Sequence, residues 1–241
     1  MLSRGALGHT SVATLTCPRS WTFCVQRRGI AADKVRAGHI VRYDKNFWRV
    51  GSAKRSQKGK NAAVIGLTLD GLGTKGGISC YGNTKTKVVS VSCGVEFEEA
   101  NYTRLKVLFS GFDENDMACF VFPIDSMDHG KEINIPGTAL LEQHQNFLCV
   151  RMPCDLLRVI DDRAGADADA GKENYIYPEM TLPNNYVYTV DKITTRNGYK
   201  FATFVECDGS VTVTDSIQPG MQVKVILRSD GTGGSFGGRA Q

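Results

Sequence analysis

The stretch FWRVGSAKRSQKGKNAAVIGLTL, from Phe47 to Leu69, predicts a β-hairpin, because two runs of β-forming residues flank a polar tip. No acidic residue lies in the tip, whose basic residues are Lys54, Arg55, Lys58 and Lys60. Such a basic cluster is the electrostatic footprint of nucleic-acid binding. Lysine-rich turns also occur simply as solvated ends that keep strand edges from aggregating. The residues of the hairpin alone leave these two interpretations evenly balanced.

Outward from the hairpin, the chain from Ala37 onward predicts short β-strands separated by turn residues. One segment departs from this pattern: GTALLEQHQ, Gly137–Gln145, predicts one or two helical turns. Short strands at this spacing indicate small barrels or sandwiches, so the predicted fold class is all-β. The predicted strands are His39–Tyr43, Phe47–Ala53, Ala62–Leu69, Ile78–Tyr81, Val88–Ser92, Leu105–Phe109, Ala118–Phe122, Phe147–Met152, Leu156–Ile160, Tyr175–Tyr177, Tyr186–Val190, Lys200–Glu206, Val211–Thr214 and Gln222–Leu227.

Charge is distributed unevenly along the 241 residues, although the net charge is only +4. Residues 33–90 hold twelve basic and three acidic residues, a net charge of +9. Residues 91–193 hold eight basic and eighteen acidic residues, a net charge of −10. A basic module followed by an acidic one predicts an oriented approach to a polyanion, in which only the basic part faces it.

Residues 1–32 have the composition of a targeting segment, with four arginines, several Ser and Thr residues and no acid. This composition favours a mitochondrial presequence and therefore a location in the mitochondrial matrix. A plastid transit peptide and a plain disordered basic tail are the alternatives. No run of about 18 apolar residues occurs, so no transmembrane helix is expected.

Three further segments are predicted to lie outside the barrels. Gly94–Thr103 is acidic and polar and is expected to be a linker or insertion. Asp161–Lys172, DDRAGADADAGK, lacks large apolar residues and is expected to be a mobile acidic insertion. The Gly-rich tail, residues 229–241, is expected to be disordered.

Signals for catalysis and for metal binding are weak. The run from Gly71 to Gly76 matches GxGxxG, but a strand is predicted after it instead of the helix that a dinucleotide site needs. His39, His129 and His144 lie in no recognisable catalytic context. The cysteines form no CxxC pairs and have no histidine at metal-ligand spacing. We therefore expect a protein that is not an enzyme and that uses no metal or cofactor.

Several stretches resemble, in the same order, the elongation factor P family, whose archaeal and eukaryotic relatives carry hypusine. Val35 to Val50, VRAGHIVRYDKNFWRV, resembles the start of the family, and KGKNAAVIGLTLDGLGTKGG resembles its loop and the following strand. Tyr175 to Ile193, YIYPEMTLPNNYVYTVDKI, resembles the end of the second domain. ATFVECDGSVTVTDSIQPGMQVKVIL, Ala202 to Leu227, resembles the third domain. The resemblance covers most of residues 35–228.

The resemblance implies a KOW-like or SH3-like barrel followed by two oligonucleotide-binding barrels. The first barrel would span residues 33–92 and carry the basic hairpin. The second would span 103–193 with the acidic insertion 161–172, and a short third barrel would span 194–228.

The resemblance also implies a factor that binds the ribosome and peptidyl-tRNA. Together with the predicted targeting segment, this makes the organellar ribosome the expected partner. We expect a monomer that does not bind a membrane. Lys60 falls where the family places a lysine, often modified, near the peptidyl-transferase centre. The tip departs from the family, because Lys58-Gly59 precedes Lys60 where Pro-Gly is usual, and Asn61 follows it where Gly is usual. Modification of Lys60 is therefore left open. The residues expected to contact RNA are Arg42, Arg49, Lys54, Arg55, Lys58, Lys60 and Lys75.

Two other functions remain open. A structural or assembly component of the mitochondrial ribosome would use the same fold without supporting peptide bond formation, because fold does not fix function. A generic RNA-binding module acting elsewhere in RNA metabolism is the third hypothesis, and it would bind bare RNA in a salt-sensitive manner.

Overall fold

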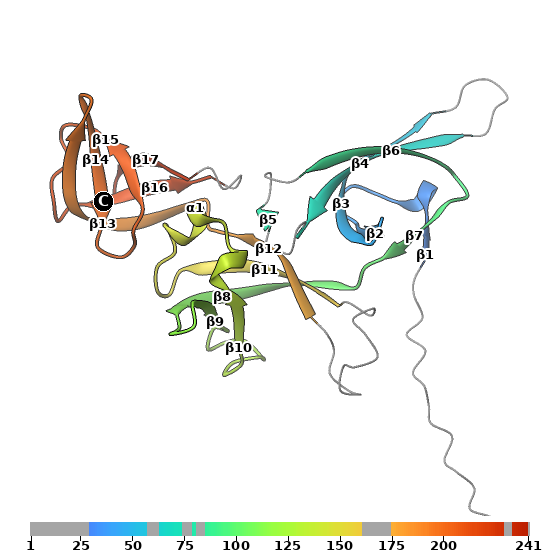
Figure 1. The fold of residues 1–241 in the computed structure, drawn as a ribbon, viewed down its shortest axis with the longest axis horizontal. Coiled ribbons are helices and arrows are strands. Elements are labelled where there is room, and N and C mark those ends of the chain that lie inside the picture. The colour runs from blue at the N-terminus through green and yellow to red at the C-terminus, as the bar shows by residue number, and fades with distance from the viewer. Residues whose placement is uncertain are drawn as a thin grey trace, which may run out of the picture.

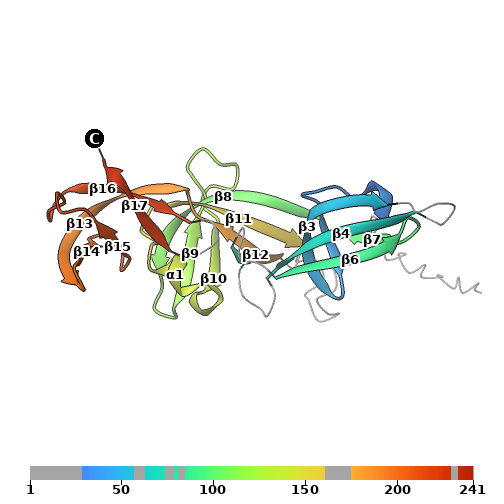
Figure 2. The same ribbon diagram turned by 90° about the horizontal axis from the view of Figure 1, so that it is seen from above.

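The computed structural model describes residues 29–56, 63–73, 79–80, 85–160, 175–228 and 233–240. Most of the predicted targeting segment, the basic residues Lys58, Lys60 and Lys75, and the insertion 161–172 lie outside the described residues. The predicted all-β fold class is confirmed. Within the described residues, three curled and mainly antiparallel sheets follow one another along the long axis of the molecule (Figure 1, Figure 2).

The first sheet has the strand order β1-β7-β2-β3-β4-β6, with every neighbouring pair antiparallel. In β4, Ile65, Leu67 and Leu69 are buried and alternate with residues on the outer face, as the two-residue period of a strand requires. They pack with Val41 and Trp48 into one core. The strands are β1 (Gly29–Ala31), β2 (Ile40–Tyr43), β3 (Asn46–Ser56), β4 (Val64–Leu72), β6 (Thr86–Ser92) and β7 (Glu96–Glu99).

The two ends of this barrel differ from the prediction. The prediction extends the targeting segment to residue 32, whereas Gly29–Ala31 form β1 and pair with β7. Ala32, in the 3₁₀ turn Ala32–Lys34, is buried with Val35. The prediction makes Gly94–Thr103 a linker, whereas β7 lies within it and buries Phe97 between exposed or half-buried acidic residues. A single buried aromatic is too short a pattern to mark a strand in an acidic segment.

The second sheet has the order β10-β9-β8-β11-β12-β5, and only the short β5 runs parallel to its neighbour. The predicted helical segment Gly137–Gln145 forms a 3₁₀ turn, Gly137–Ala139, and the one-turn helix α1, Glu142–Gln145. No described helix has the length and apolar character needed to cross a membrane. The strands are β5 (Ser79–Cys80), β8 (Tyr102–Phe112), β9 (Met117–Val121), β10 (Glu132–Pro136), β11 (Pro153–Ile160) and β12 (Tyr175–Thr181).

One predicted strand of this region, Phe147–Met152, is wrong. These residues form the turn between α1 and β11, and Phe147, Leu148, Cys149 and Met152 are buried. The apolar run therefore marks residues that fill the core, and periodicity alone cannot distinguish such a run from a buried strand.

The third sheet has the order β15-β14-β13-β16-β17. The tail predicted to be disordered contains β17, which pairs antiparallel with β16. The sheet begins with β13 at Asn185 instead of at residue 194, because one long strand crosses the expected boundary. The strands are β13 (Asn185–Arg196), β14 (Tyr199–Phe204), β15 (Ser210–Val213), β16 (Gln222–Leu227) and β17 (Gly234–Arg239).

The second and third sheets share one continuous core. Tyr188 of β13 is fully buried, and its hydroxyl donates a 2.6 Å hydrogen bond to the carbonyl oxygen of Phe147. Its ring stacks on Phe204 with centroids 4.8 Å apart. The two sheets are therefore packed as one unit.

The first and second sheets meet through a smaller apolar cluster, named here the junction cluster. Its buried members are Ile40, Phe47 and Leu72 of the first sheet and Leu157 and Val159 of β11. Because each sheet contributes buried side chains, the junction holds the first sheet against the second.

Candidate nucleic-acid interface

The end of the β3–β4 hairpin forms the candidate interface. Figure 1 shows the far ends of these two strands projecting from the first sheet, away from the second and third sheets, and Figure 2 agrees. The register pairs Lys54 with Gly66 and Arg55 with Ile65. Both basic side chains are exposed. The charges of Lys54 and Arg55 are therefore exposed to solvent near the end of two hydrogen-bonded strands.

Lys54 lies on the outer face of the sheet among small residues. The register of β3, β4 and β6 places Gly66 and Ser90 beside it, and Ser52 and Thr68 come next on the same face. The Ser52 and Thr68 hydroxyls are hydrogen-bonded at 3.0 Å. Small side chains let a polymer backbone approach the sheet closely, and hydroxyl groups are suitable donors to phosphate oxygens.

Arg55 points to the opposite face, because successive residues of a strand alternate. Its cross-strand partners are the buried Ile65 and, one strand further, the half-buried Val91. Arg55 lies at the edge of the barrel core and is exposed to solvent. The hairpin end therefore carries positive charge on both faces, which suits a position between two phosphate-bearing surfaces better than contact with only one.

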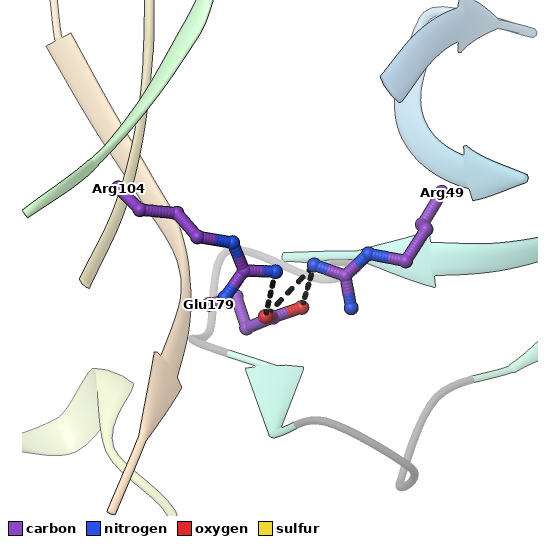
Figure 3. Close-up of polar contacts among 3 residues, drawn as sticks. All are labelled: Arg49, Arg104 and Glu179. Carbon is purple, nitrogen blue, oxygen red and sulfur yellow. Dashed lines mark hydrogen bonds and ion pairs between the residues drawn. The ribbon is translucent and has the colours of Figure 1, made fainter. Parts of the chain in front are cut away.

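Arg49 requires a correction. Instead of steering RNA, its side chain is 11% exposed and its Nη2 donates a 2.8 Å hydrogen bond to Oε1 of Glu179 in β12 (Figure 3). Glu179 is 1% exposed and also lies 3.7 Å from Nη2 of the half-exposed Arg104. An arginine committed to a buried carboxylate is not available to a phosphate. Its role is to join the first and second sheets.

Arg42 is also held within the protein. Its side chain is 8% exposed, its Nε lies 3.9 Å from Glu98, and its guanidinium lies 4.5 Å from the centre of the Phe47 ring. Of the seven predicted contact residues, the structure therefore brings Lys54 and Arg55 together at the surface. It places Arg42 and Arg49 in internal contacts, and Lys58, Lys60 and Lys75 lie outside the described residues.

The sequence predicts that Lys45 lies in the turn between the first two strands, but the expected RNA contacts do not include it. This residue forms the two-residue turn between β2 and β3 with Asp44, and their φ values are 63° and 53°. A two-residue loop with both φ values positive is the type I′ turn, in which Asn and Gly are preferred. The available signal was the pair Asp-Lys in a two-residue loop between two strands, where a lysine is unusual.

No group of three or more metal-ligating side chains occurs in the part of the chain that the structure describes. The thiols described there, Cys93, Cys119, Cys149, Cys154 and Cys207, are free. Burial raises the pKa values of Cys154 and Cys207 to about 12. These two thiols are therefore protonated and poorly nucleophilic at neutral pH.

No protein-family model matches the chain, and no curated protein matches it. Among solved structures, the chain is similar to eukaryotic translation initiation factor 5A from Methanococcus jannaschii, at 12% identity and a TM-score of 0.37, over 62% of this chain and 94% of that one. It is also similar to a translation initiation factor 5A family protein from Naegleria fowleri, at 12% identity and a TM-score of 0.38, over 64% of this chain and 98% of that one.

A third similar structure is a multidomain protein with nucleic-acid-binding domains from Streptococcus pneumoniae, at 10% identity and a TM-score of 0.24, over 88% of this chain and 72% of that one. Two of the three neighbours are thus translation factors. At these identities and scores, the likeness carries no argument about the activity of this chain.

Proposed function

We propose that this chain is a translation factor of the elongation factor P type, which binds RNA on the ribosome beside peptidyl-tRNA. The observation that carries the proposal is the exposure of Lys54 and Arg55 on opposite faces of a hairpin end that points away from the other sheets. The resemblance of residues 35–228 to elongation factor P supports it independently.

In this proposal the hairpin positions RNA and performs no group chemistry. Lys54 and Arg55 neutralise phosphates, which sets affinity and orientation without reading sequence. Lys60, six residues after Lys54 in the chain, supplies a compact charge near the peptidyl-transferase centre. Any gain in the rate of peptide bond formation then comes from the orientation of the substrates.

The attachment of the hairpin to the rest of the molecule fits this role. The junction cluster and the Arg49–Glu179 pair fix the first sheet to the second. Strand ends that are already ordered before binding, such as the one that carries Lys54 and Arg55, lose less conformational entropy when they meet RNA. We also propose that the protein acts in the mitochondrial matrix, on the basis of the basic, acid-free residues that precede β1, 1–28.

The departure of the tip residues around Lys60 from the family favours a second candidate function. Lys-Gly precedes Lys60 and Asn follows it, so a modifying enzyme would meet an altered tip. In the second candidate function, the protein is a resident or assembly component of the mitochondrial ribosome. Such a component needs the RNA-binding face and does not need the modified lysine.

Sedimentation of an organelle lysate, before and after a high-salt wash, tests the proposal and separates the two functions. We expect substoichiometric migration with monosomes that salt removes. The variant Lys54→Glu/Arg55→Glu should leave the ribosome fraction. Lys192→Glu/Lys224→Glu on the third sheet carries the same charge change and should stay. Salt-stable, one-to-one migration would favour the resident component, and retention of the hairpin variant would overturn the role of the hairpin.

A further inference from the structure

A cleft of about 510 Å³ lies between the first and second sheets, at the end of β3 opposite the hairpin tip. One wall is the turn Lys45–Phe47 and the end of β4, and the other is β10 and the first residues of β12. Its volume lies within the range of about 300–1,000 Å³ that is typical of small-molecule sites. The proposed function of the hairpin uses none of these residues.

The second-sheet wall presents two tyrosine rings. Tyr175 and Tyr177 are two residues apart in β12, so their side chains leave the same face of the strand, and both line the cleft half-buried. The guanidinium of Arg158 lies 4.6 Å from the centre of the Tyr175 ring. Aromatic rings beside a positive charge form a stacking platform for an unpaired base.

Two amides face the cleft from opposite walls. The Asn134 side chain, on β10, is exposed and makes no hydrogen bond with another described residue. The Asn46 amide nitrogen donates a 3.0 Å hydrogen bond to the carbonyl oxygen of Asp44, which leaves its amide oxygen as an acceptor. An amide offers both donors and an acceptor, which are the groups that read the edge of a base.

Lys45 supplies the charge. It is the one charged side chain among the described residues that line the cleft, it is exposed, and it forms no ion pair with a described residue. The neighbouring Asp44 carboxylate is paired with Lys87 at 3.5 Å. Lys45 also adopts a φ of 63°, which disfavours a residue with a side chain and suits glycine. Strained backbone positions cluster at functional sites.

The cleft is preformed. Phe47 and Leu72, which line it, are buried in the junction cluster, and Ile176 of the opposite wall packs against that cluster. The two walls are therefore fixed relative to each other. A preformed site avoids the cost of ordering its walls when a ligand binds.

We propose that this cleft binds one unstacked nucleotide of a single-stranded RNA. The base stacks on Tyr175 and Tyr177, Asn46 and Asn134 contact its edge, and Lys45 holds its phosphate. The described residues that line the cleft include a cation and two amides but no acid, which favours RNA over a basic or apolar peptide as the ligand. The inference deepens the proposed function, on which it rests, by adding a second RNA contact. β3 has 11 residues, so at about 3.3 Å per residue the two contacts lie roughly 33 Å apart.

The test measures the affinity of the full chain for uridine and adenosine 5′-monophosphates by NMR titration, and for a 10-nucleotide RNA by fluorescence anisotropy. We expect Lys45→Gly and Tyr175→Leu to weaken mononucleotide binding about tenfold, in line with the loss of a stacked or charged contact. Lys45→Gly keeps the test valid if Tyr175→Leu fails to fold, because glycine suits the turn. Tyr199→Leu, at an exposed tyrosine of the third sheet, is the matched control and should bind normally.

The hairpin variant Lys54→Ala/Arg55→Ala separates this inference from the proposed function. It should weaken binding of the 10-nucleotide RNA and leave mononucleotide affinity unchanged. If Lys45→Gly and Tyr175→Leu both bind mononucleotides with the wild-type affinity, the cleft is not a nucleotide site, whether it is empty or covered by a protein. That result would not contradict RNA binding by the hairpin. An RNA containing 4-thiouridine provides the second measurement: crosslinks at Tyr175 or Tyr177 support the site, and crosslinks confined to the hairpin overturn it.

Discussion

Arg49 and Glu179, 130 residues apart in the chain, form a buried ion pair across the junction of the first two sheets, with Nη2 2.8 Å from Oε1. Glu179 is 1% exposed and Arg104 approaches it from the other side (Figure 3). Charges removed from water in this way are costly unless they remain paired. The pair therefore joins the basic barrel to β12 through one carboxylate, in addition to the apolar contacts of the junction cluster.

Removal of that carboxylate should destabilise the protein strongly. Glu179→Ala leaves the buried Arg49 guanidinium without compensation, and we expect a loss of about 3–5 kcal/mol in the free energy of unfolding. Urea unfolding followed by circular dichroism measures the loss. Glu132→Ala, at an exposed glutamate of β10, is the control and should stay near wild type. The double variant Arg49→Met/Glu179→Leu should recover much of the loss, and equal losses in Glu179→Ala and Glu132→Ala would show that the pair is dispensable.

His144 should make the stability depend on pH. Burial lowers the pKa of His144 from 6.5 to about 4, because the charged imidazolium is poorly solvated in the core. Between these two values the unfolded chain binds a proton that the folded protein does not, so acidification favours unfolding. The stabilisation is complete above pH 6.5 and is lost as the pH falls toward 4. We expect His144 to lower the free energy of unfolding by about 2 kcal/mol between pH 7 and pH 5.

Urea titrations at the two pH values measure this change. His144→Gln should remove most of it, whereas His129→Gln, at an exposed histidine, should retain it. The same slope in wild type and His144→Gln would assign the pH dependence to other groups.

Alternation of apolar and polar residues decided what the sequence could predict. QVKVIL, residues 222–227, alternates polar and apolar residues over its first four positions and forms β16 with the predicted bounds. GSFGGR, residues 234–239, has no such pattern, yet it forms β17 because β16 offers an open edge and Phe236 packs against the shared core. Local composition contains neither the edge nor the core, so a Gly-rich strand is read as a disordered tail.

The candidate site shows the same division. The exposed position of Lys54 and Arg55 near the end of the hairpin could be predicted, because a basic tip between two strands is a local pattern. The burial of Arg49 could not be predicted, because a charged residue in a strand indicates a surface position until its partner is known. Glu179 lies in a different sheet, and only the packing of the two sheets brings it to Arg49.

The hairpin residues should determine the salt dependence of RNA binding. Each phosphate contact to a single strand contributes about 0.7 to the slope of log affinity against log salt concentration. Lys54→Ala/Arg55→Ala should therefore lower that slope by about 1.4. The slopes are measured by fluorescence anisotropy with a 10-nucleotide RNA at about 50 to 300 mM potassium chloride. This range brackets the concentration of about 0.1 M at which the Debye length is about 10 Å. Lys192→Ala/Lys224→Ala is the control, and an equal decrease in both variants would indicate diffuse charge without a site.

The packing of β17 on the shared core can be tested by adding one methyl group to Gly234. A Cβ on Gly234 of β17 would lie 2.7 Å from Cγ1 of Val225 and 2.9 Å from Cζ of Phe147. Both neighbours are buried in the core that the second and third sheets share, so they have little room to move. Gly234→Ala should therefore lower the free energy of unfolding by about 1–3 kcal/mol through overpacking. Gly94→Ala is the control, because its Cβ would meet nothing within 4 Å. If thermal unfolding shows the two variants to be equally stable, β17 does not pack on this core in solution, and the tail is disordered as its composition predicts.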